Sequence, residues 1–147
     1  MTVYADNAAT TQMSDSVLKA MMPLLTDIYG NPSSLHSVGQ IAKEHLEAAR
    51  ETVAECIGAD PKEIYFTSGG SEADNQAIRS AAYIGARKGK KHIISSKFEH
   101  HAVLHTLDAL KKEGFTVTLL DVYSNGIVKP EDVANAITDE TCLVTIM

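Results

Sequence analysis

Helical and strand spacings of hydrophobic residues alternate along this chain of 147 residues. Apolar residues three and four positions apart predict five helices: 14–29, a long helix ending at Gly58, 71–84, 99–113 and a short helix opening at Pro130. Short apolar runs predict strands at 64–67, 93–95, 115–120 and 142–147. This alternation favours an α/β domain with a largely parallel sheet.

The first two helices carry clear end signals. Ser14 can cap the first helix, and Pro23 should kink or shorten it because proline has no backbone N–H to donate. Gly58 should end the second helix. The face of the second helix that we expect to point inward carries Ile41, Leu46, Ala49, Val53 and Ile57.

The composition of the chain argues against several classes of protein function. Acidic residues outnumber basic ones, 19 to 13, which argues against nucleic-acid binding because no basic stripe is present to displace phosphate counterions. No stretch approaches the ~20 apolar residues that span a bilayer, and the start of the chain is not a secretory signal. Two cysteines, Cys56 and Cys142, are too few for a disulfide framework and read as small core residues. We therefore expect a cytoplasmic protein that contacts neither membrane nor nucleic acid.

The most specific local motif is TSGGSEADN at 67–75, between a predicted strand and a predicted helix. Glycines let the backbone turn tightly, and the free N–H groups and dipole of a helix start favour an anion. Ser71 can add a hydroxyl donor, so the motif can cradle a phosphate. A plain turn, with Ser71 as helix cap and Asp74 completing an imperfect capping box, explains the spacing equally well.

A second motif is EHHAVLH at 99–105. His100 lies where a strand passes into a helix, on the ligand side of an α/β sheet, where an imidazole can stack on a planar cofactor and move protons. His101 and His105 share a helix face, as two zinc ligands would. Ala102 stands where a metalloprotease has its glutamate, and no third ligand is evident, so we predict no metal site.

Four motifs occur in a fixed order: YADNAATT at 4–11, GNPSSLH at 30–36, TSGGSEADN at 67–75 and EHHAV at 99–103. Together they resemble the N-terminal part of pyridoxal-phosphate-dependent cysteine desulfurases, in the class V aminotransferase family. The closer likeness is to the branch that serves nitrogenase and iron–sulfur cluster assembly. The resemblance covers essentially the whole chain, and the four motifs are specific only in combination.

The resemblance implies a type I, aspartate-aminotransferase-like fold, built as a homodimer around pyridoxal phosphate. It implies an N-terminal arm over 1–13, near the active site and the small domain, and the N-terminal portion of the large cofactor-binding domain over 14–147. The matched positions imply roles for five residues: Gly70 and Ser71 at the cofactor phosphate, catalytic His100 on the pyridine ring, and Asn7 and Ala8 in the substrate pocket. Ser71 replaces a usual threonine and keeps the hydroxyl.

The implied reaction converts L-cysteine to L-alanine and leaves sulfur as an enzyme-bound persulfide, destined for a scaffold protein that assembles clusters. In the family, the Schiff-base lysine, the aspartate on the pyridine nitrogen and the nucleophilic cysteine lie beyond the position of Met147. Residues 142–147 read as an inner strand with no loop after it. We therefore expect a fragment without desulfurase activity of its own, although a natural C-terminal strand remains the alternative.

Two other classes of function stay open. The first is another class V enzyme with the same cofactor, such as a selenocysteine lyase or an aminotransferase. The second is a non-catalytic, truncated piece that serves in dimerisation or binding.

Overall fold

The computed structural model describes residues 2–147. Contacts divide the chain into two compact units, of which the first ends at Tyr65 and the second spans Phe66–Met147. The boundary expected after residue 13 stays a prediction. Within residues 2–147, no helix is long and apolar enough to cross a membrane.

The first unit contains two α-helices, α1 (Asp15–Thr26) and α2 (Ser37–Ile57), and the 3₁₀ helix η1 (Pro61–Glu63). Ser14 caps α1 as predicted, because its hydroxyl accepts the Val17 N–H. The helix continues past Pro23 for one short turn only, and so ends before Tyr29. Gly58 ends α2 with a positive φ of 67°, which favours glycine.

Most of the predicted inward face of α2 is not buried, and only Leu46 is half-buried among its described residues. Ile41, Val53 and Ile57 are exposed, and the buried residues of this helix are Gly39, Ala42 and Ala54. A helix buries only what a neighbouring element covers, and within its own unit α2 meets little beyond η1. Cys56, on the same helix, is likewise exposed rather than part of a core.

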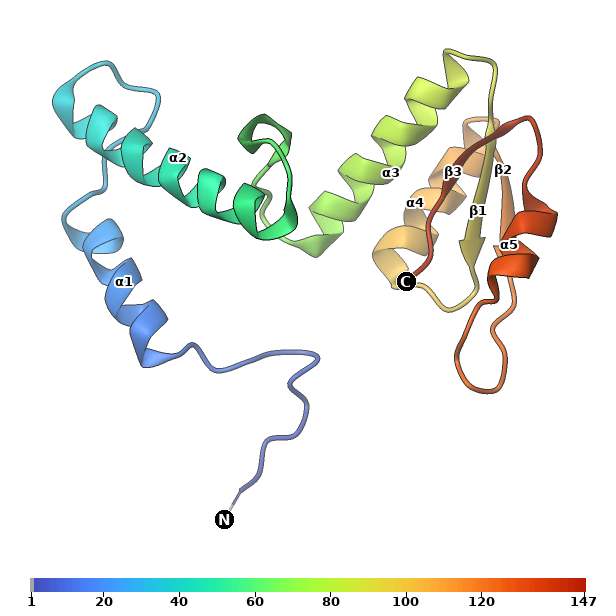
Figure 1. Ribbon diagram of the computed structural model, residues 1–147, viewed down its shortest axis with the longest axis horizontal. Coiled ribbons are helices and arrows are strands. Elements are labelled where there is room, and N and C mark those ends of the chain that lie inside the picture. Colours follow the sequence, from blue (N-terminus) through green and yellow to red (C-terminus); the bar gives the residue numbers. More distant parts are fainter. Residues whose placement is uncertain (1) are drawn as a thin grey trace. The chain divides into compact units, whose positions relative to one another are not determined.

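The second unit contains the sheet (Figure 1). Its elements are α3 (Gly70–Ala86), β1 (His92–Ser96), α4 (His101–Lys112), β2 (Thr116–Leu120), α5 (Pro130–Ala136) and β3 (Thr141–Val144). The three strands are parallel in the order β2-β1-β3, which confirms the α/β class and the parallel sheet. Residues 64–67, predicted as a strand, form none, because no described strand pairs with them.

Apolar side chains of α3, α4 and β1 form the core of this unit. Its buried members are Ile78, Ala82, Ile93, Val103, Leu107, Leu110 and Phe115. On the other face of β1, the buried ring of His92 bonds to Thr118 (2.9 Å) and Thr141 (2.8 Å), and so joins all three strands. Both ring nitrogens are therefore satisfied, as a buried polar group requires.

Two contacts fix helix α3 in place. A Cβ added at Gly85 would lie 2.3 Å from the Cβ of Cys142, so the helix lies against β3 with no room for a side chain. Arg79 and Tyr83 donate hydrogen bonds of 3.0 and 2.9 Å to the two carboxylate oxygens of Glu113, just after α4. These bonds hold the pKa of Glu113 below its usual value. Helix α3 is thus held both at the sheet and at the far end of α4.

Candidate functional site

Helices α3 and α4 both run opposite to β1, so both begin toward the end of the sheet where β1 ends (Figure 1). The carboxyl ends of strands are where α/β sheets bind ligands. Gly70 and Ser71 open α3, and His100 immediately precedes α4. The fold of the second unit therefore brings these three predicted residues to the same end of the sheet.

The start of α3 offers unpaired backbone donors. Gly69 is the N-cap and provides no side-chain cap, and the first hydrogen bond of the helix runs from the Ala73 N–H to the Gly69 carbonyl (3.1 Å). Within the described chain, the N–H groups of Gly70, Ser71 and Glu72 have no acceptor. A Cβ added at Gly69 or Gly70 would meet nothing within 4 Å, so the space beside these donors is open.

Glu72, rather than Ser71, braces the turn before α3. One of its carboxylate oxygens accepts both the N–H and the hydroxyl of Ser68, each at 2.7 Å. These two bonds lower the pKa of Glu72. The alternative of a helix cap at Ser71 with a capping box from Asp74 is therefore wrong, because Gly69 is the N-cap, and the exposed Ser71 hydroxyl has no partner among the described residues.

These groups fit a phosphate. Three unpaired N–H groups, a free hydroxyl and the positive end of a helix dipole lie together at the start of α3, and such a donor set favours an anion. The Glu72 carboxylate already takes two hydrogen bonds from Ser68, so it does not need these donors. The start of α3 is therefore suited to the phosphate group of pyridoxal phosphate.

His100 is the N-cap of α4. Its Nδ1 accepts the N–H of Ala102 at 3.1 Å, and its ring is exposed. When Nδ1 accepts a hydrogen bond, a neutral imidazole carries its proton on Nε2. The backbone thus fixes the tautomer and leaves Nε2 as the atom at which this ring can give or take a proton.

Asn7 and Ala8 lie in the first unit, in an exposed segment before α1. The segment turns at Asp6, whose carbonyl accepts the N–H of Ala9 at 3.1 Å. Their place in a substrate pocket stays a prediction.

The structure indicates neither a metal site at His101 and His105 nor an activated thiol at Cys142. The rings of His101 and His105 lie 5.6 Å apart, and no cluster of three or more possible metal ligands occurs within residues 2–147. Burial raises the pKa of the Cys142 thiol, which donates to the His92 carbonyl at 3.3 Å. A thiol kept protonated is a poor nucleophile, so Cys142 is unsuited to accept sulfur.

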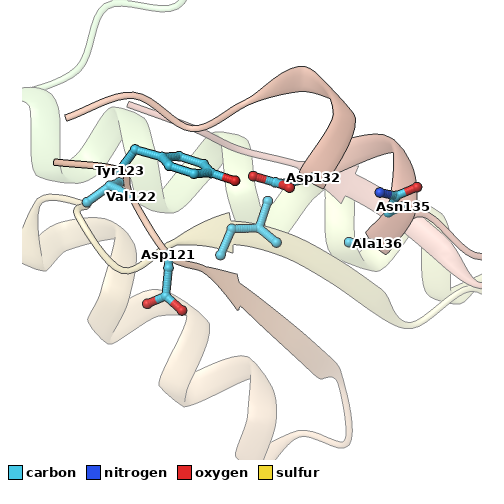
Figure 2. Close-up of a pocket in the computed structure, with 7 residues that line it drawn as sticks. Asp121, Val122, Tyr123, Asp132, Asn135 and Ala136 are labelled. Atoms are coloured by element: carbon cyan, nitrogen blue, oxygen red, sulfur yellow. The ribbon is translucent and has the colours of Figure 1, made fainter. Parts of the chain in front are cut away.

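A hollow of about 540 Å³ lies beside α5, where β2 ends. Its polar lining is Asp121, Tyr123, Asp132 and Asn135, and Figure 2 shows the Tyr123 hydroxyl turned toward Asp132. Lys97 pairs with Asp121 at 2.6 Å, and the Asp132 carboxylate remains to oppose an anion, so this hollow suits the cofactor phosphate less well than the start of α3 does.

Sequence reasoning missed one residue in β1 and one in the connection from β1 to α4. The hydroxyl of Ser95 is fully buried and has no hydrogen-bond partner among the described residues. Strand alternation could have placed it on the same side as Ile93, toward α3 and α4. Glu99 binds the backbone of Met147, 48 residues away, and no local signal announces that contact.

The family model described as aminotransferase class V matches residues 3–147. The chain belongs to the class V aminotransferases. Among curated members of this family, it is 52% identical over 145 residues to the cysteine desulfurase IscS of Clostridium botulinum, and 49% identical to that of Methanosarcina thermophila. Each alignment covers 99% of this chain and 36% of the relative, so the chain spans about a third of their length.

Solved structures of class V relatives have the same fold. A NifS-like protein superposes with a TM-score of 0.94 at 41% identity, over 100% of this chain and 40% of that one. A structure described as SspA in complex with cysteine gives 0.91 at 39% identity, over 99% and 42%. The sequence resemblance and the type of fold that it implied are thereby confirmed.

Proposed function

We propose that this sequence forms the N-terminal part of a cysteine desulfurase. The substrate sulfur would pass to an enzyme thiol: its bond to carbon breaks, an S–S bond forms, and the carbon takes up a proton to give L-alanine. Support comes from the IscS relatives and from the neighbour solved with cysteine. The observation that carries the proposal is the open start of α3, with three unpaired N–H groups, at the same end of the sheet as His100.

The role proposed for each site residue comes from the family resemblance. The N–H groups of Gly70 and Ser71, with the Ser71 hydroxyl, would hold the phosphate of pyridoxal phosphate. The His100 ring would lie against the pyridine ring and would hold or move a proton at Nε2. Pyridoxal phosphate, when bound, supplies an electron sink for the substrate. Asn7 and Ala8 contribute to the substrate pocket, from an arm that spans 1–13.

The wider setting is part of the same proposal. The enzyme is a homodimer, works in the cytoplasm and passes its sulfur to a scaffold protein for iron–sulfur clusters. Cys56 is exposed, Cys142 is half-buried, and both are free thiols, which agrees with a reducing compartment.

An activity assay tests the proposed reaction. The full-length protein that carries this sequence, loaded with pyridoxal phosphate, should release equal amounts of alanine and, with a dithiol reductant, sulfide from L-cysteine. The 147-residue chain alone should match the blank, because it supplies none of the family's Schiff-base lysine, aspartate or nucleophilic cysteine. A full-length protein that acts on selenocysteine only, or on neither substrate, would contradict the proposal, as would activity of the chain alone.

Ser71→Ala should weaken the cofactor phosphate site. Loss of one hydroxyl donor to a charged group is expected to raise the Kd for pyridoxal phosphate about tenfold, and Ser71→Thr should keep it. The Kd is measured by absorbance titration of the full-length apoenzyme. Ser80→Ala, at an exposed position of the same helix, is the matched control. Equal Kd values for the Ser71→Ala and Ser80→Ala variants would refute the phosphate assignment.

A further inference from the structure

The connection between β1 and α4 is fixed at each of its residues. The Lys97 N–H donates to the Leu120 carbonyl at 2.9 Å, which ties the connection to β2. The Phe98 N–H donates to the Ser96 hydroxyl at 3.2 Å. His100, at the end of the connection, bonds to the first turn of α4. Among the described residues, the Lys97 N–H links the connection to β2, and Glu99 links it to the segment after β3.

Glu99 joins β1 to the segment after β3. Its Oε1 accepts the Ser96 hydroxyl at 2.9 Å and the Met147 N–H at 2.7 Å. Ser96 is 2% exposed, so one end of this bridge is anchored in the sheet. The segment after β3 is already aligned with β1, because the Thr145 N–H donates to the Ile94 carbonyl at 2.9 Å. Glu99 thus extends the pairing of β1 and β3 beyond the last ladder bond.

We infer that Glu99 is a positioning residue, whose bonds to Ser96 and Met147 fix His100 relative to the chain leaving β3. The catalytic consequence rests on the proposed function, in which His100 moves a proton at Nε2. His100 follows Glu99 directly, so a displacement of Glu99 reaches the ring through one peptide unit. The carboxyl ends of β1 and β3 are neighbours, and ligands bind where such strands end.

The position of the two hydrogen bonds allows a variant to distinguish a positioning role of Glu99 from a proton-transfer role. Both bonds end on one oxygen, Oε1, and both partners are donors. A glutamine in the same rotamer keeps that oxygen as an acceptor, whereas it cannot act as a carboxylate base. Glu99→Gln should therefore behave like the wild type, and Glu99→Ala should not.

Amide hydrogen exchange tests the bridge without reference to activity. In the full-length protein, Glu99→Ala should speed exchange at the Met147 N–H about tenfold, because this N–H loses its charge-assisted hydrogen bond. Glu99→Gln should exchange at the wild-type rate. Glu51→Ala, an exposed glutamate of α2 with no hydrogen bond or ion pair among the described residues, is the matched control. Unchanged exchange at Met147 in Glu99→Ala would overturn the inference.

Kinetics test the effect on His100. Glu99→Ala should lower kcat about tenfold while the Kd for pyridoxal phosphate stays constant, because the phosphate cradle is on α3. Glu99→Gln should restore kcat with the wild-type pH profile, and equal loss in both variants would overturn the positioning role. If Glu99→Ala does not fold, Ser96→Ala removes the bond from Ser96 to Glu99, together with the bond from Phe98 to Ser96, and should change both readouts in the same direction. A wild type that releases no alanine would refute the proposed function, and the exchange comparison would still decide the bridge.

Discussion

His100→Asn is expected to lower kcat of the full-length enzyme about a hundred- to ten-thousand-fold, the usual contribution of a positioned proton-transfer group. Asparagine is a good helix N-cap, and its side-chain oxygen can accept the Ala102 N–H that Nδ1 accepts now. The variant should therefore keep α4 folded and lose only the imidazole. Steady-state kinetics and thermal unfolding measure the two effects separately.

His100→Ala removes both functions of this residue. It should match the asparagine variant in kcat and in addition lose about 1 kcal/mol of stability, because the cap is gone. His105→Asn, on the exposed face of the same helix, is the matched control and should retain activity. Wild-type kcat in His100→Asn would show that the ring plays no part in the reaction.

Gly85→Ala is expected to destabilise the protein by about 1–3 kcal/mol, as overpacking a well-packed site does. Alanine normally favours a helix over glycine by about 1 kcal/mol, so the sign of the effect is informative. The new Cβ would lie 2.3 Å from the Cβ and 2.9 Å from the Sγ of Cys142. No rotamer change relieves a contact between two Cβ atoms, so α3 must move away from β3.

Chemical denaturation of the full-length apoprotein measures this effect. Cys142→Gly removes the two Cys142 atoms, which are the nearest that the new methyl group would meet, so the double variant should recover much of the loss. A stabilising Gly85→Ala would mean that α3 and β3 are further apart than described. Failure of the double variant to recover would place the strain elsewhere, for example at the Lys90 carbonyl, 3.2 Å from the added Cβ.

The sequence predicted those elements whose signals are local. Helices α3 and α4, the strands β1 and β2, and the short helix opened by Pro130 each carry their own periodicity, cap or stop signal. The strand expected at 64–67 and the inward face of α2 depend instead on what covers them, and no local pattern specifies a distant partner. Hydrophobic periodicity therefore predicted more buried side chains in α2, and more strand pairing at 64–67, than the structure has.

In the candidate site, too, local sequence signals pointed to some residues and missed others. The sequence pointed to Gly70, Ser71 and His100 because helix starts have recognisable local sequences, and their roles stay a prediction. It did not point to Glu99, because its partner Met147 is 48 residues away, nor to Gly85, whose close approach to Cys142 depends on how α3 packs against the sheet. Contacts between distant segments, rather than motifs, determine these supporting residues.

The small size of the buried residues in α2 has a practical consequence. Burial of these residues, Gly39, Ala42 and Ala54, removes little apolar surface from water. Larger apolar side chains stay exposed: Ile57 is 68% exposed, and Leu35, just before the helix, is 93% exposed. A peptide cut after Tyr65 would gain too little from burial to offset the entropy of ordering its backbone. Such a peptide should aggregate, because its apolar side chains are exposed to water. A solubility tag, or co-expression with the rest of the chain, will be needed to study it.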